Sequence, residues 1–210
     1  GIQCMRRVMQ SGLRPTVLRL YDPLDSLMAG FHSKTDGGED IHRAAARFSG
    51  LKSILASAVT ELNAKGLAVG LLRPSLLNRV VELLPTRSLL IAGVQGSNAE
   101  VTKQWDRFGT IVESVRGEDL GPEPGLSWYN RRYGISYKQS KIYQAGAFVD
   151  TMEVATTWEN LGLMYRAIVK ALSKHVFIMA HFSHAYPQGC SIYFTFAAYR
   201  PTARTRKSTY

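Results

Sequence analysis

The feature that most constrains the fold is a pair of apolar and aromatic runs near the C-terminal end, joined by a short polar turn. They flank Tyr186-Pro187-Gln188-Gly189 within the stretch 179–199. Runs of this composition on either side of a turn predict a β-hairpin. Proline at the second position of the turn and glycine at the fourth suit a type I turn. The chain is therefore expected to contain an antiparallel pair of strands here.

The predicted hairpin carries several groups that bind or transfer protons: His181, Ser183, His184, Cys190 and Tyr193. A two-residue connection would place His184 opposite Ser191, with His184 and Tyr193 as diagonal neighbours on one face. His181 would then lie on the other face, opposite Phe194, although a slip of one residue would reverse the faces. A phenol beside an imidazole is a candidate proton-transfer or substrate-binding pair. The alternative is a pair of half-buried side chains with satisfied hydrogen bonds.

The rest of the chain alternates strand-like and helix-like segments. Strands are expected at 14–22, 87–96, 110–115 and 147–158. Helices are expected at 2–12, from 41 to 84 with interruptions, from 97 and at 161–172, whereas the Gly- and Pro-rich stretch 116–130 is expected to be a loop. Strands separated by helices, together with one hairpin, predict an α+β fold with a mainly antiparallel sheet flanked by helices.

Arg19 stands in the middle of the otherwise apolar strand at 14–22, on the same face as Val17 and Tyr21. A guanidinium at such a position needs acceptors or an anion, because it cannot lose its charge. One interpretation is a structural ion pair, for example with Asp22. The other is that Arg19 meets an anionic or carbonyl-bearing ligand on the face of a sheet.

The chain has 26 Lys and Arg against 16 Asp and Glu, a formal net charge of +10. This charge favours an anionic partner, either a small molecule or, through a peripheral contact, a membrane surface. No nucleic-acid partner is expected, because no nucleic-acid-binding motif accompanies the charge. No metal site is expected either, since no third ligand lies at a recognised spacing from His181 and His184. The two cysteines lie far apart, as expected of a cytoplasmic protein without a disulfide framework.

Three stretches together resemble a known family: "SGLRPTVLRLYD", "KQSKIYQAGAFVDTMEVATTW" and "HAYPQGCSIYFTFAAY". They are similar to the C-terminal half of flavoenzymes of the vanillyl-alcohol-oxidase type, and most similar to the alkyldihydroxyacetonephosphate synthase family and its bacterial relatives. The resemblance implies that residues 1–199 form a cap domain of ferredoxin-like character over the substrate site. FAD would be held mainly by an N-terminal domain absent from this chain, and 200–210 would form a basic tail leading to a further segment.

The resemblance also implies site residues. Arg19 matches the cap arginine of the family and Tyr193 its active-site tyrosine, so both are expected to contact flavin and substrate. His184 is expected to assist Tyr193 in catalysis, and His181 to bind substrate. Gln139 stands where family members with a substrate-phosphate arginine carry it. Lys138, Gln139 and Lys141 are therefore further candidates for substrate binding, although an ammonium does not reproduce the bidentate contact of arginine.

The activity implied for the full-length protein is exchange of the acyl group of an acyl-dihydroxyacetone phosphate for a fatty alcohol, with an anionic, lipid-like substrate. The resemblance leaves two alternatives, an FAD-dependent dehydrogenase of 2-hydroxy acids such as D-lactate or glycolate, and a non-catalytic binding domain. A homodimer is expected of the full-length protein. The chain by itself would be expected to be inactive.

Overall fold

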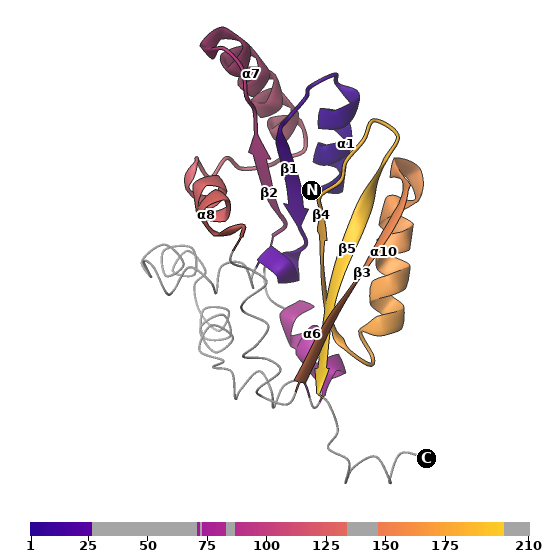
Figure 1. Cartoon of the computed structure of the whole chain (residues 1–210). Helices are drawn as coiled ribbons and strands as arrows, with labels where there is room; N and C mark the ends of the chain where they lie inside the picture. The colour runs from indigo at the N-terminus through magenta and orange to yellow at the C-terminus, as the bar shows by residue number, and fades with distance from the viewer. Residues whose placement is uncertain (27–70, 72, 83–86, 134–146, 200–210) are drawn as a thin grey trace, which may run out of the picture.

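The computed structural model describes residues 1–26, 71, 73–82, 87–133 and 147–199. Within these parts the chain forms a five-stranded sheet in the order β2-β1-β4-β5-β3, with every neighbouring pair antiparallel (Figure 1). The strands are β1 (Val17–Tyr21), β2 (Leu89–Gly93), β3 (Ala147–Thr157), β4 (Phe177–Phe182) and β5 (Gly189–Tyr199). The predicted α+β class with an antiparallel sheet is confirmed, and so is the hairpin, formed by β4 and β5.

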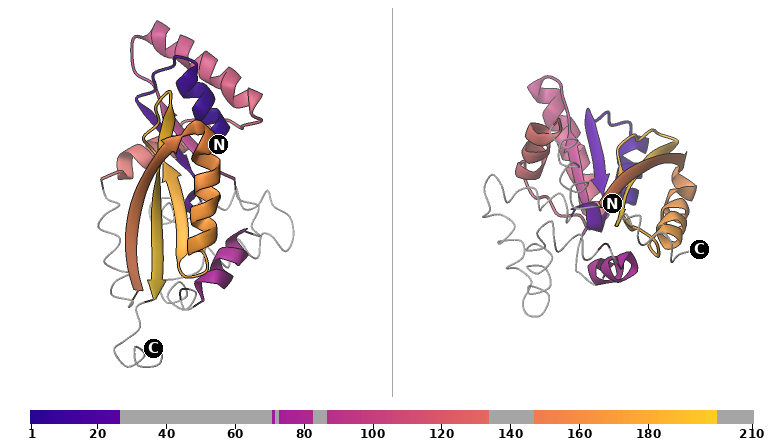
Figure 2. Two further views of the ribbon diagram at one scale, coloured as in Figure 1. Left: turned by 90° about the vertical axis from the view of Figure 1, so that its right-hand side faces the viewer. Right: turned by 60° about the horizontal axis from the view of Figure 1, so that its bottom comes forward.

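Five helices are described with this sheet: α1 (Ile2–Gln10), α6 (Pro74–Glu82), α7 (Asn98–Ser114), α8 (Glu123–Arg131) and α10 (Trp158–Leu172). A helical turn also follows β1. Helices α1, α7 and α10 contribute apolar side chains to one core with the sheet, as Met5, Phe108 and Leu161 do. Figure 2 shows α10 running along β3 and β5 on one side of the sheet. None of the described helices is long and apolar enough to cross a bilayer.

Alternation along the strands decides which side chains enter this core. In β1, Leu18 and Leu20 are buried within it, as Ile192 and Phe194 are in β5. Because successive side chains of a strand point to opposite faces, Arg19 must point away from the core that α1 and α10 cover. The predicted division of β1 into an apolar face and a face that contains Arg19 is therefore correct.

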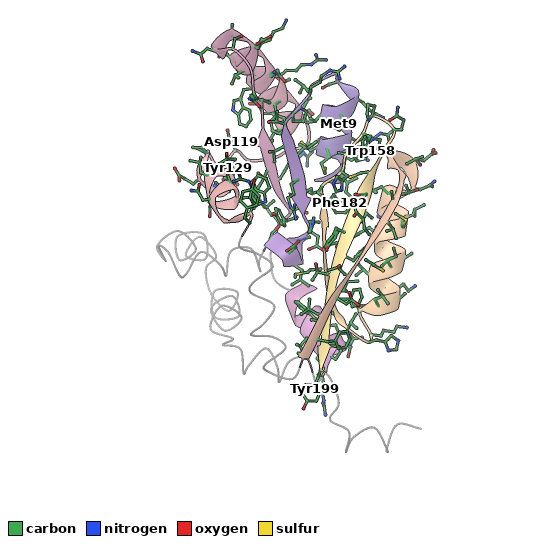
Figure 3. The ribbon with its side chains drawn as sticks, in the orientation of Figure 1. Met9, Asp119, Tyr129, Trp158, Phe182 and Tyr199 are labelled. Carbon is green, nitrogen blue, oxygen red and sulfur yellow. The ribbon has the colours of Figure 1, made fainter. Side chains whose placement is uncertain are left out.

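Trp158 fixes the start of α10 against the turn of the hairpin. Its indole Nε1–H donates to the carbonyl oxygens of Tyr186, at 2.9 Å, and Pro187, at 3.1 Å. Figure 3 labels Trp158 at this end of the helix, and Phe182 on β4. Gly189 is required at the start of β5, because a Cβ there would lie 2.2 Å from the carbonyl oxygen of Thr156. The turn, β3 and α10 are thus joined at one end of the sheet.

Two predicted elements are wrong. The segment 110–115, expected as a strand, is the last part of α7 and its C-cap. Its apolar residues Ile111, Val112 and Val115 continue the helical spacing of Phe108 and pack against the core. The stretch 116–130, expected as a loop, contains most of α8, which begins directly after Pro122. Proline is tolerated in the first turn of a helix, where its missing N–H would have no partner.

Asp22, at the end of β1, is a buried carboxylate that joins three elements. It is 4% exposed and accepts hydrogen bonds from the Tyr165 hydroxyl of α10 and the Ala180 N–H of β4, both at 2.9 Å. It also accepts the N–H of Asp25 at 2.7 Å. Burial raises the pKa of Asp22 to about 6, against these hydrogen bonds, which favour the ionised form.

This raised pKa predicts how stability depends on pH. Because the folded-state pKa of Asp22 lies above its unfolded value, the stabilising contribution of its protonation is fully present below pH about 4 and lost as pH rises through about 6. Relative to the Asp22→Asn variant, the wild-type free energy of unfolding should fall by on the order of 3 kcal/mol between these limits. Urea unfolding of both proteins at a series of pH values measures this change. A wild-type free energy of unfolding that rises with pH relative to that of the variant would contradict it.

Candidate functional site

The face of the sheet opposite to α1 and α10 carries a row of polar side chains across four strands. Strand register aligns Tyr21 with His181, His181 with Tyr193, and Tyr193 with Glu153. We call the polar row the side chains of Arg19, Tyr21, Thr151, Glu153, His181, Ser191 and Tyr193. Segments far apart in the sequence thus place a cation, two phenols, an imidazole and a carboxylate next to one another.

Arg19 and His181 form the centre of the polar row. The Arg19 Nη2 atom lies 2.6 Å from His181 Nε2, and the other ring nitrogen, Nδ1, lies 3.2 Å from Asp25 Oδ2. The side chains of His181 and Asp25 are 13% and 14% exposed. Arg19 therefore contacts a histidine, whereas Asp22, its expected partner in the structural interpretation, accepts hydrogen bonds from Tyr165 and Ala180.

Two tyrosines flank this centre. The ring of Tyr193 stacks on the His181 ring, with centroids 4.8 Å apart and planes inclined by 21°. Its hydroxyl donates to Thr151 Oγ1 at 3.0 Å. The guanidinium carbon of Arg19 lies 5.2 Å from the centre of the Tyr21 ring, and burial raises the pKa of Tyr21, partly opposed by the charge of Arg19. Arg19 and Tyr193 thus lie on one face, as a shared role requires.

His184 belongs to a separate, more exposed group at the end of the polar row. Its Nδ1 lies 3.0 Å from Glu153 Oε1 and 3.3 Å from Ser191 Oγ, and the Ser191 hydroxyl donates to Glu153 Oε1 at 2.7 Å. The hydrogen bond from Ser191, followed by that from His184, lowers the pKa of Glu153. The His184 side chain is 62% exposed. This group can bind or exchange protons at the edge of the site.

The predicted pairing of the hairpin is correct near the turn and wrong within the strands. His184 lies opposite Ser191, as expected, but His181 pairs with Tyr193 rather than with Phe194. Between the His181–Tyr193 and Ala185–Cys190 pairs there are three residues on one side and two on the other. This extra residue is a β-bulge. It brings His181 to the face of Tyr193, so His181 rather than His184 contacts the tyrosine ring.

Other candidate residues lie outside the described parts of the chain or on the core side of the sheet. Lys138, Gln139 and Lys141 lie outside the described residues, as does the basic tail 200–210. Cys190 is buried on the core side, and burial raises the pKa of its thiol to about 12, so it is held in the unreactive thiol form. Within the described ranges, no group of three His, Cys, Asp or Glu side chains is placed to hold a metal ion.

The sequence interpretation missed three members of the site: Asp25, Thr151 and Glu153. Thr151 and Glu153 alternate with Met152 and Val154 of β3, which pack on the core. That alternation was a usable signal for their face, but not for their partners. Asp25 lies in the helical turn after β1, where no local pattern distinguishes it from a solvated acid.

Comparison with known protein families identifies the class of protein to which this chain belongs. All of residues 1–210 match the model of the family "FAD linked oxidases, C-terminal domain". The chain belongs to this family, whose members are parts of FAD-linked enzymes.

Two curated relatives carry the name alkyldihydroxyacetonephosphate synthase. The protein of Trypanosoma brucei brucei is 23% identical over 194 residues, covering 89% of this chain and 28% of the relative. That of Dictyostelium discoideum is 27% identical over 117 residues, covering 52% of this chain and 19% of the relative. The chain thus spans less than a third of the length of these relatives.

Solved structures of alkyldihydroxyacetonephosphate synthase share the fold. One, in space group P212121, superposes with a TM-score of 0.64 at 18% identity, covering 99% of this chain and 34% of that one. Another, in space group P1, gives a TM-score of 0.63 at 19% identity, with 99% and 35% covered. These two comparisons support a shared fold.

Proposed function

We propose that residues 1–199 are the substrate-binding cap domain of an FAD-dependent enzyme whose flavin is held by another part of the full-length protein. The observation that carries this proposal is the polar row, which gathers Arg19, His181 and Tyr193 on the sheet face opposite to α1 and α10. Only one sheet face is needed to complete the helix-covered core. The other face can then contribute to a site.

The residues of this face fit a flavin and an anionic substrate. The Nε atom of Arg19 is buried and has no hydrogen-bond partner in the described parts of the chain. A buried donor without a partner is costly unless a ligand satisfies it. The neighbouring Tyr193 and His181 rings are stacked and offer an aromatic surface. Helix α8 borders the same face, because a Cβ added at Gly125 of α8 would lie 4.0 Å from Cγ2 of Ile91, which pairs with Arg19.

The proposed reaction replaces the acyloxy group of an acyl-dihydroxyacetone phosphate with the alkoxy group of a fatty alcohol, and the acyloxy group leaves as a fatty acid with the proton of the alcohol. FAD, when bound, would supply the electron-accepting ring system on which this chemistry depends. Arg19 would hold an anionic or carbonyl oxygen of the substrate, as a fixed charge that cannot dissociate. Tyr193 would transfer a proton at its hydroxyl, which the hydrogen bond to Thr151 orients. The names of the two relatives and the net charge of +10 support an anionic lipid-like substrate.

Replacing Tyr193 with phenylalanine tests this role. In the full-length holoenzyme, Tyr193→Phe should lower kcat for exchange by about a hundredfold, because the proton-transfer group is lost. FAD content should be unchanged, since the ring that stacks on His181 remains. Tyr129→Phe is the matched control, because Tyr129 is 54% exposed on α8.

Three results would overturn the proposal. The first is a Tyr193→Phe enzyme as active as wild type. The second is a full-length protein that does not bind FAD. The third is anaerobic bleaching of the flavin by D-lactate or glycolate without alkyl exchange, which would indicate a 2-hydroxy acid dehydrogenase.

A further inference from the structure

The contact between Arg19 and His181 determines where the histidine carries its proton. A guanidinium has only donors, so Nε2 of His181, 2.6 Å from Arg19 Nη2, must be the acceptor and carry no hydrogen. The imidazole proton is then on Nδ1, which lies 3.2 Å from Asp25 Oδ2 and donates to it. The geometry thus sets a neutral imidazole between a carboxylate and a guanidinium.

We propose that His181 is a positioning residue, which Asp25 holds in the Nδ1–H form so that Nε2 fixes the Arg19 guanidinium in the polar row. This assignment rests on the proposed function, and it adds Asp25 to the site. It differs from the expectation that His181 binds substrate directly. It also differs from a role as a general base, because the ring nitrogen that would accept a proton is already used by Arg19.

The arrangement has a consequence for ligand binding. A carboxylate in direct contact with Arg19 would orient it but also neutralise much of its charge. A neutral imidazole orients the guanidinium without supplying an opposing charge, while Asp25 contacts the far side of the ring. The positive charge of Arg19 therefore remains available to an anionic or carbonyl group of the substrate. Tyr193, stacked on His181, restricts the ring from the β5 side.

The protonation pattern can be measured without substrate or turnover. The full-length protein is labelled with 15N-histidine, and the difference spectrum between wild type and His181→Gln isolates the signal of His181. We expect a neutral ring with the proton on Nδ1. A ring protonated on Nε2, or on both nitrogens, would overturn the assignment.

Two substitutions then separate positioning from proton transfer. In His181→Gln, the amide oxygen can accept from Arg19 and the NH2 group can donate to Asp25, so kcat/KM for alkyl exchange should stay within about threefold of wild type. In His181→Leu, Arg19 loses its acceptor, and kcat/KM should fall by about tenfold to a hundredfold, mainly through KM. An equal loss in both variants, or no loss in either, would overturn the proposal.

The two experiments also separate this inference from the proposed function. A full-length protein that binds no FAD, or exchanges no alkyl group, would refute the proposed function. The labelled-histidine spectrum would still decide whether Asp25 and Arg19 fix the Nδ1–H form of His181, since that measurement involves no flavin.

Discussion

Replacing Arg19 with leucine is expected to lower kcat/KM of the full-length enzyme by about 10³-fold, the scale of losing a fixed charge that faces the reacting group. Leucine keeps an apolar stem on β1 but provides no donor to His181 or to a ligand. Arg19→Lys should recover little of this loss, because an ammonium group does not reproduce the planar fork of a guanidinium. Steady-state kinetics of the holoenzyme with an acyl-dihydroxyacetone phosphate and a fatty alcohol measure both changes.

The control for Arg19 is Arg107→Leu, which removes the same charge from an exposed position on α7. It lowers the net charge equally but lies outside the polar row, so kcat/KM should remain near the wild-type value. If Arg107→Leu reduced activity as much as Arg19→Leu, a general loss of positive charge would explain both. An active Arg19→Leu enzyme would show that Arg19 is structural.

Truncating Phe194 to alanine is expected to destabilise the domain by about 3–5 kcal/mol, the usual cost of removing a buried phenylalanine ring. Phe194 is 0% exposed, at the centre of β5, and pairs with Ala180 on one side and Met152 on the other. Its ring stacks on Tyr165, with centroids 6.1 Å apart. The cavity would therefore open between the sheet and α10, and urea unfolding would measure the resulting loss in the free energy of unfolding.

Tyr186→Ala is the control for Phe194, since it removes an aromatic ring from the same hairpin. The Tyr186 side chain is 59% exposed at the turn, and only its backbone groups make the hydrogen bonds to Gly189 and Trp158. We expect a change of less than about 0.5 kcal/mol. Similar losses in both variants would contradict the position of the core described here.

Local patterns in the sequence were sufficient to predict much of the fold. Alternation in β1 separated Leu18 and Leu20 from Arg19, and the helix expected from 97 begins there as α7, with a capping box of Ser97 and Glu100. The turn residues located the hairpin. These features depend on neighbours in sequence, which the sequence displays directly.

The site depended on contacts that no local pattern encodes. The bulge between His181 and Ala185 changes the face of His181, and it follows from how β4 pairs with both β1 and β5. Asp25 reaches His181 only because Tyr21 pairs with His181 across these strands. The segment 110–115 was assigned as a strand because it contains β-branched residues. Such residues also suit the face of a helix that packs against a core, and a short apolar run does not distinguish the two.

The most direct test of the account is the structure of the full-length protein with FAD bound. We expect the flavin ring system on the polar-row face, with Arg19 or Tyr193 within about 4 Å of the flavin or of a bound substrate analogue. A flavin bound on the side of α1 and α10, or remote from both residues, would contradict it.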